Sequence, residues 1–420
     1  MAASMSRPDT RVRIAFDLAA GGAGNFFTLD DPTKGELNNA TFKLAGDILE
    51  DVTNEVRSVT VRRGRSRELE RFQAGAATVT LDNSQRKYDP AAGTAITPYG
   101  ASMRPRKAVQ ISSNGAAIFT GIVDDWDLDY SLDGDHVASV KVTDAFAFLA
   151  QQAIEPHTTT AQTTGERITA ILDRAEIAWP EGKREIDTGV ATLQADAIGG
   201  TAADAKPVPA LAYLQQVEIA EQGALFIGKG GALTFRSRSA LQVLTEVAFT
   251  DDGTGIPYTD IAAKYGSEEL RNRINIIRLN GGTATAVDND SVAAYGAIDY
   301  ELRDVLLATD TQAQSLADVI LARYSEPLLR VDSVEVVLNN LTATQQAQVL
   351  DLDLGSLVQV KYTPSGIGDP IEQFVAVDSI EHNIDAQVHR MRFNFSQGEA
   401  PALVLDSLLY GVLDTNTLGF

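Results

Sequence analysis

Short apolar runs with a period of two, separated by turn residues, occupy residues 58–143. Such alternation puts one face of a strand in a core and the other in water. Asn114-Gly115 and Asp133-Gly134 lie between runs, and these dipeptides favour tight hairpin turns. The runs are 59–61, 78–81, 109–111, 118–126 and 137–142. The pattern predicts an antiparallel meander, in the form of a small barrel or a sandwich.

The period then changes to that of helices. Thr163 and Glu166 form a capping box before apolar residues spaced 0, 3, 4 and 7, and Trp179-Pro180 ends this helix. Further helices are predicted from Pro209 to Gly223 and from Thr309 to Pro327. Strands are predicted at 225–227, 233–235, 274–279, 331–338, 357–360, 374–380 and 388–395.

These patterns predict a mainly β fold with α+β parts. The expected parts are an N-terminal arm with loose strands (1–55), a first β-barrel domain (56–155), an α+β domain with helices and a hairpin (156–270), a strand-helix connecting domain (271–330), a second β-barrel domain (331–396) and a C-terminal tail (397–420). The two β regions share a similarity, because 109–111, 122–126 and 137–142 resemble 358–360, 376–380 and 388–393. Internal duplication and chance similarity between strands both stay open.

Charge is distributed unevenly along the chain. The formal net charge is −22, which argues against general nucleic-acid binding and against docking on an anionic membrane. Residues 57–107 hold eleven basic and four acidic side chains, so this segment is +7 and the rest is −29. Such neighbouring regions suit contacts between copies or partners, although two solvated faces would give the same pattern. The predicted assembly residues are Arg62, Arg63, Arg65, Arg67 and Arg71.

An acidic cluster follows at 124–135. Its spacing does not fit a calcium loop, and a pair of hydrolytic carboxylates is a weak alternative. Alternation places Asp127 and Asp129 on one strand face, solvated or lumenal, and Leu128, Tyr130 and Leu132 in the core.

The sequence predicts no catalytic, cofactor or metal site. There is no Cys, and the four His residues have no zinc spacing and no accompanying nucleophile motif. His136 and His389 are predicted to be structural. Residues 223–230 nearly spell a phosphate loop, but Gly230 follows Lys229 where Ser or Thr is needed. No secretory signal and no apolar run long enough to span a membrane is expected.

Several segments carry a family resemblance. They are Val59–Phe72, Ala77–Asn83, Lys87–Pro90, Arg104-Pro105, Ile118–Gly121, Val142–Ala145 and, more loosely, Glu221–Phe226, Leu233–Arg236, Asn272–Ile274, Ser291–Gly296 and Leu413–Leu418. Together they resemble minor tail proteins and tail-tip hubs of long-tailed bacteriophages.

The resemblance implies a non-enzymatic virion protein at the tail tip, related to phage baseplate hubs. Such hubs are homotrimers whose two barrel domains per chain give pseudo-sixfold symmetry. The implied partners are a distal tail protein, a tape measure protein and other tail-tip or receptor-binding proteins. The −29 balance and the strand face of Asp127 and Asp129 predict an acidic lumen through which phage DNA passes without specific binding, and no direct membrane insertion is expected. A hexameric distal tail ring protein and a receptor- or glycan-binding tail protein are the alternatives.

Overall fold

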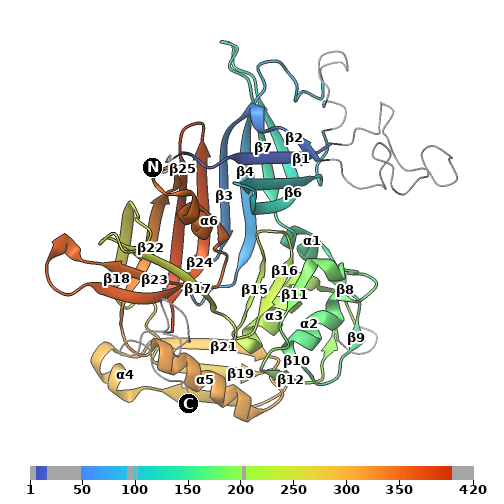
Figure 1. Cartoon of the computed structure of the whole chain (residues 1–420). Helices are drawn as coiled ribbons and strands as arrows, with labels where there is room; N and C mark the ends of the chain where they lie inside the picture. Colours follow the sequence, from blue (N-terminus) through green and yellow to red (C-terminus); the bar gives the residue numbers. More distant parts are fainter. Residues whose placement is uncertain (1–5, 17–48, 92–98, 100–102, 201–204, 400–420) are drawn as a thin grey trace.

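The computed structural model describes residues 6–16, 49–91, 99, 103–200 and 205–399. Most of the expected tail 397–420 and much of the expected arm 1–55 lie outside these residues, as does Leu413–Leu418. The described part is mainly antiparallel β, with one large sheet and two helix-containing regions below it (Figure 1). The expected mainly β fold with α+β parts is confirmed.

The first β region forms one half of the large sheet. Its strands are β1 (Thr10–Ala15), β2 (Leu49–Asp51), β3 (Val56–Gly64), β4 (Gln73–Asp82), β5 (Ala108–Ser113), β6 (Ala116–Asp129) and β7 (Val137–Thr143). Asn114 and Gly115 have φ values of 47° and 82°, which the tight β5–β6 turn requires. β1 pairs with β5 and β2, so part of the expected arm is sheet.

The second β region forms the other half. Its elements are β17 (Val243–Thr250), β18 (Asp260–Tyr265), β22 (Leu329–Val337), α6 (Ala343–Asp351), β23 (Ser356–Tyr362), β24 (Ile371–Asp385) and β25 (His389–Gln397). β17 and β18 come from the range predicted as the α+β domain. They join the large sheet because Val247 and Phe249 of β17 pack into its core and β18 pairs with β22.

The two halves are one sheet. β24 pairs with β3 from Ser379–Gly64 to Asp385–Ser58, and one apolar cluster continues across both halves. Within the described residues the hydrogen bonding closes neither half into a barrel. In the part of the chain that the structure describes, the halves are joined edge to edge through β24 and β3.

The helix-containing regions share a second core. One packs α1 (Phe146–Gln151), α2 (Thr164–Leu172) and α3 (Ala210–Glu221) with β11 (Arg184–Ile186), β15 (Ala224–Ile227) and β16 (Leu233–Arg236). The other contains β19 (Arg273–Arg278), β20 (Thr283–Val287), α4 (Asn289–Tyr295), β21 (Asp299–Val305) and α5 (Asp310–Tyr324). The predicted capping box of Thr163 and Glu166 is present.

Short elements connect these parts. The two-residue strands are β8 (Ala153–Ile154), β9 (His157–Thr158), β10 (Gln162–Thr163), β12 (Thr192–Leu193), β13 (Ala197–Ile198) and β14 (Val208–Pro209). The 3₁₀ turns are η2 (Thr53–Glu55), η4 (Glu181–Lys183), η6 (Leu338–Asn340) and η7 (Pro364–Gly366).

Candidate functional site

Two four-stranded units with the same strand order make up the centre of the large sheet. The first unit is β3-β4-β7-β6 and the second is β18-β22-β25-β24. Their cross-strand registers match along one row, although the β18–β22 register shifts between Ala262 and Ala263 and the β3–β4 register next shifts only between Arg62 and Gly64. One row of partners is Thr60, Thr78, Lys141 and Asp125 in the first unit, and Ala262, Ser333, Asn394 and Ser379 in the second.

A bulge recurs at the same point of both units. Between β6 and β7 the register shifts between Val123 and Asp125, which leaves Asp124 outside the ladder. Between β24 and β25 it shifts between Val377 and Ser379, which leaves out Asp378. An extra residue at equivalent positions is a built feature of a strand pair. The two β regions therefore share strand order, one row of the register and a bulge. The structure matches Lys141 with Asn394, two residues away from the sequence match of 137–142 to 388–393.

The pairing of β24 with β3, here called the internal joint, connects the second unit to the first. Arg62 of β3 and Glu381 of β24 are register partners, and their side chains form an ion pair of 3.3 Å. Gly64 ends β3 with a φ of 112°, and a Cβ there would lie 2.1 Å from the carbonyl oxygen of Asp378. The internal joint therefore requires a glycine at position 64, because a side chain there would collide with the bulged residue Asp378.

Both units carry polar side chains on the side of the sheet opposite the apolar core, and this side is here called the polar face. Because Glu381 and Arg62 lie on the same side of the joint, the face is continuous across both units. Its charged side chains include Asp125, Asp127, Asp129, Asp260, Glu335, Glu381 and Asp385, with Arg62, Lys141, Lys264, Arg390 and Arg392. Acidic groups outnumber basic groups among these residues.

Asp127 and Asp129 lie on the polar face, as the alternation of the strand predicts. Asp127 pairs with Lys141 of β7 at 2.5 Å, and its side chain is half exposed. The apolar residues that alternate with these aspartates do not all lie in the core. Leu128 packs against the core, but Tyr130 is 46% exposed and Leu132 lies fully exposed in the turn beyond β6. The prediction of a core position for Tyr130 and Leu132 is wrong, because the end of β6 extends past the core that its first half covers.

The five predicted arginines lie in two settings. Arg63 is buried and donates to Asp353 at 2.7 Å and to the carbonyl of Ile227 at 3.0 Å. Arg65 donates to Asp378 at 2.9 Å and stacks over the ring of Phe72. Arg63 and Arg65 therefore form contacts between distant segments of the same chain.

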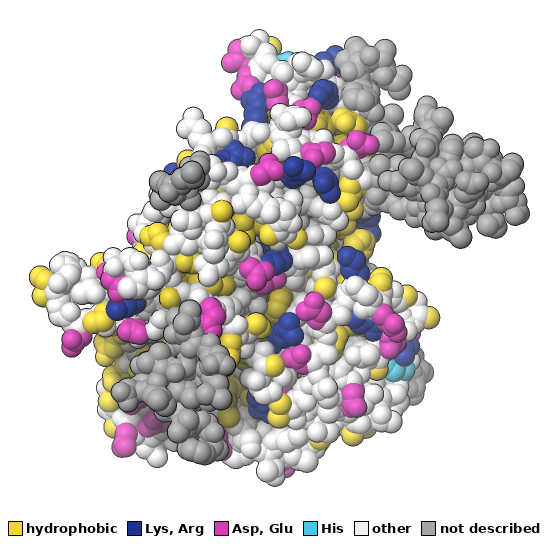
Figure 2. Space-filling view, in the orientation of Figure 1, with side chains coloured by type: hydrophobic (Ala, Val, Ile, Leu, Met, Phe, Trp, Pro, Cys, Tyr) yellow, Lys and Arg dark blue, Asp and Glu magenta, His cyan; other side chains and the backbone are white. Residues whose placement is uncertain are grey.

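The other three arginines are more exposed. Arg62 and Arg67 keep more than half of their side-chain surface exposed, and Arg67 pairs with Glu268 at 2.9 Å. Arg71 donates to Gln215 at 3.3 Å. Contact of these arginines with another copy stays a prediction. On the face seen in Figure 2, basic and acidic side chains are interspersed.

The acidic partners of these arginines, Asp353, Asp378 and Glu268, were not predicted from the sequence. Asp378 had a signal, because Val377-Asp378 aligns with Val123-Asp124 in the similar segments. Burial raises the pKa of Asp378, while Arg65 opposes that rise. The pair is stable in this geometry because Ser396 and Arg65 both donate to the same carboxylate.

Two buried histidines lie beside the internal joint. His382 of β24 and His389 of β25 approach with Nδ1 and Nε2 3.1 Å apart, and Ser113 of β5 lies 3.4 Å from His389 Nδ1. Burial lowers the pKa of His389 to about 4 and holds that of His382 well below its usual range. His389 is buried in a strand, as expected of a structural histidine.

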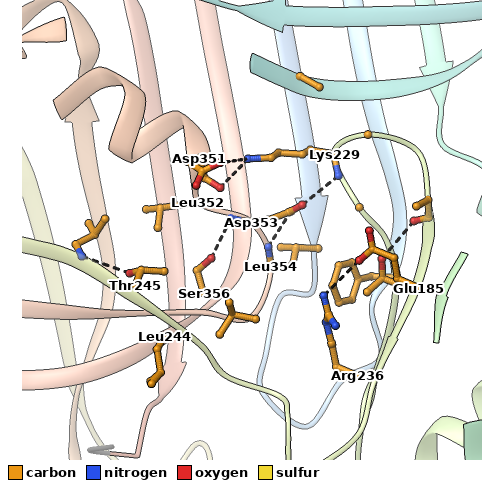
Figure 3. Close-up of a pocket in the computed structure, with 18 of the residues that line it drawn as sticks. Glu185, Lys229, Arg236, Leu244, Thr245, Asp351, Leu352, Asp353, Leu354 and Ser356 are labelled. Carbon is orange, nitrogen blue, oxygen red and sulfur yellow. Dashed lines mark hydrogen bonds and ion pairs between the residues drawn. The ribbon is translucent and has the colours of Figure 1, made fainter. Parts of the chain in front are cut away.

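A pocket of about 750 Å³ lies between the β15–β16 turn, β17 and the end of α6 (Figure 3). Lys229 Nζ donates to the carbonyls of Leu350 at 3.1 Å and Asp351 at 2.6 Å, which are the last carbonyls of α6. A cation there satisfies unpaired carbonyls and the negative end of the helix dipole. The near-match to a phosphate loop is therefore a hairpin turn whose lysine caps a helix.

Among the described residues, no His, Asp or Glu side chains group so that three could hold a metal ion. In the part of the chain that the structure describes, no helix is both long and apolar enough to cross a bilayer.

Comparison of the sequence finds no matching family model and no matching curated protein. Comparison of the structure finds tail proteins. The chain is similar to a 43 kDa tail protein of prophage MuSo2 from Shewanella oneidensis (TM-score 0.54, 14% identity, 84% of this chain and 95% of that one). It is also similar to a tail protein from Neisseria meningitidis MC58 (0.57, 11%, 93% and 96%) and to a prophage tail protein from Listeria monocytogenes EGD-e (0.50, 11%, 93% and 95%). The predicted resemblance is confirmed for the fold, and the chain has the fold of phage tail proteins.

Proposed function

We propose that this protein is a structural subunit of a phage tail, and that three copies form the hub of the tail tip. The observation that carries the proposal is the repeated four-stranded unit. Because each chain holds two units of the same strand order with one matching row of the register, three chains supply six similar units. A ring of that kind can continue a sixfold tail tube while remaining a trimer.

The polar face is proposed to line the passage of this ring. The opposite face is covered by the apolar core, so the polar face is the one that water can occupy. Its excess of carboxylates, with Asp127 and Asp129 among them, suits a passage for DNA because like charges do not hold the polymer. The chain's own net charge of −22 acts in the same direction.

In this proposal the hub is not an enzyme. It belongs to the virion and contacts a distal tail protein, the tape measure protein and receptor-binding proteins. The fold shared with tail proteins supports the virion role. The exposed Arg62 and Arg67 are candidates for contact with neighbouring proteins.

Mass photometry of the purified protein and reconstruction of tails that contain it test the proposal. We expect three copies per ring and Asp127 and Asp129 facing the axis. A hexamer would favour a distal tail ring, and one copy per assembled tail would contradict the hub. An outward position of both Asp residues would contradict the lumenal role of the polar face.

A further inference from the structure

Two edges of the sheet correspond to the two sides of the internal joint and lack a strand partner among the described residues: the part of β6 beyond Ile122 and the outer side of β18. In β24, residues 371–376 pair with β23, and beyond them residues 379–385 pair with β3 on the same edge. In β6, residues 116–122 pair with β5, but among the described residues no strand continues along that edge beyond them. The outer edge of β18, the counterpart of β3, also has no strand partner within the described part of the chain.

We propose that the free edge of β6 in one copy pairs with the free edge of β18 in a second copy, in the register of the internal joint. The matched row fixes that register. Asp125 corresponds to Ser379, and Thr60 corresponds to Ala262, so Asn383 opposite Thr60 corresponds to Asp129 opposite Ala262 of a second copy. The proposal rests on the proposed ring and names the contact that builds it.

The charges at the two edges fit this register. In the internal joint Arg62 faces Glu381. Two positions after Thr60 and Ala262 come Arg62 and Lys264, and two positions before Asn383 and Asp129 come Glu381 and Asp127. The contact therefore places Lys264 of a second copy opposite Asp127. A glycine also recurs, because Gly266 corresponds to Gly64.

The apolar side chains fit as well. In the internal joint, Ile384 lies opposite Val59 and both are buried. Their counterparts are Tyr130, which is 46% exposed, and Ile261, which is partly exposed. Pairing of the edges would cover both side chains, and it would satisfy backbone groups that an edge strand leaves open.

The contact joins two different surfaces, so it is heterologous, and a heterologous contact closes into a ring or grows without end. Figure 1 shows β18 and β6 on opposite sides of the sheet. A copy can therefore engage one neighbour at each edge at the same time.

Engineered cysteines test the register, because the natural chain contains none. The test variant carries Asp129→Cys and Ala262→Cys, whose Cα atoms would be within disulfide distance across an antiparallel pair. The matched control carries Thr60→Cys and Asn383→Cys, which face each other in the internal joint. A third variant, Asp129→Cys with Lys264→Cys, is displaced by two residues along the strand.

After mild oxidation, we expect the test variant to form covalent species of two and three chains. The control should form a disulfide within one chain, and the displaced variant should cross-link at least about tenfold less, since disulfides tolerate little misplacement. Thermal melting of each reduced variant checks that it folds.

Mass photometry of the same samples separates the two proposals. Trimers without cross-links in the test variant would overturn the edge pairing and leave the proposed trimer standing. Cross-linked ladders that continue beyond three chains would support the edge pairing and contradict the trimer. Monomers without cross-links would contradict both.

Discussion

The guanidinium of Arg63 lies 2.7 Å from the carboxylate of Asp353, and the two residues are 290 positions apart in the chain. Arg63 leaves β3 on the core side, while Asp353 follows α6, so the pair connects the first unit to the connection between α6 and β23. Arg63 is 4% exposed, whereas the carboxylate of Asp353 keeps contact with water.

Replacement of Arg63 by Met is expected to lower the free energy of unfolding by roughly 2–4 kcal/mol, because Asp353 and the Ile227 carbonyl lose their charged donor. Among the described residues, Asp353 then keeps only the backbone N–H groups of Lys229 and Leu354 as donors. Arg62→Met is the matched control on the exposed side of the same strand. It should cost less than about 1 kcal/mol, since an exposed ion pair contributes little. Equal losses in urea unfolding would contradict the structural role of Arg63.

Gly64→Ala is expected to disrupt the internal joint. Its added Cβ would lie 2.1 Å from the Asp378 carbonyl, in addition to the cost of a positive φ. Gly134→Ala is the control, because Gly134 also has a positive φ but has open space around it. We expect the control to cost about 1–2 kcal/mol and Gly64→Ala clearly more. Calorimetric melting of both variants checks the difference.

A lower pH is expected to destabilise the protein near the internal joint, because His382 and His389 are protonated on unfolding. Their folded pKa values lie below the usual 6.5, at about 4 for His389, so the unfolded chain binds more protons. Their contribution to stability is therefore complete above pH 6.5 and falls as the pH drops toward 4. Arg63 and Lys229 act on His382, and Arg7 acts on His389, to disfavour the charged forms further.

Buried carboxyls act in the opposite direction over part of this range, because burial raises the pKa of Asp144 to about 6 and of Glu218 to about 7. The test therefore compares the loss of stability of the wild type with that of a variant that lacks both histidines. Unfolding free energies of the wild type and of a His382→Asn, His389→Gln variant are compared from pH 7 to 4.5. The wild type should lose more stability than the variant, and parallel curves would contradict the role of the pair.

Lys229→Met is expected to lower stability by about 1–2 kcal/mol, because the carbonyls at the end of α6 lose a charged donor. Lys183→Met, at an exposed position of η4, is the control and should change little. Chemical denaturation measures both. If Lys229 belonged to a phosphate loop, the variant would instead lose nucleotide binding with its stability unchanged.

The sequence predicted the elements whose signals are local. The capping box at Thr163, the hairpin at Asn114-Gly115 and the long apolar face of α5 each depend on residues close together in the chain. The alternation of β6 also placed Asp127 and Asp129 on one face. β18 gave little signal, because it has only Ile261 as a strongly apolar residue within an exposed edge.

The sequence by itself determined the mainly β class, the two similar regions and the alternating faces of their strands. Only the tertiary structure decided how these regions meet. The pairing of β24 with β3, the parallel pairing of β17 with β23 and the burial of Arg63 against Asp353 all join distant segments. In the sequence, Arg63 is one of eleven basic residues in the segment 57–107. Its neighbours are set by long-range strand pairing, which no local pattern encodes, and for that reason its burial could not be predicted.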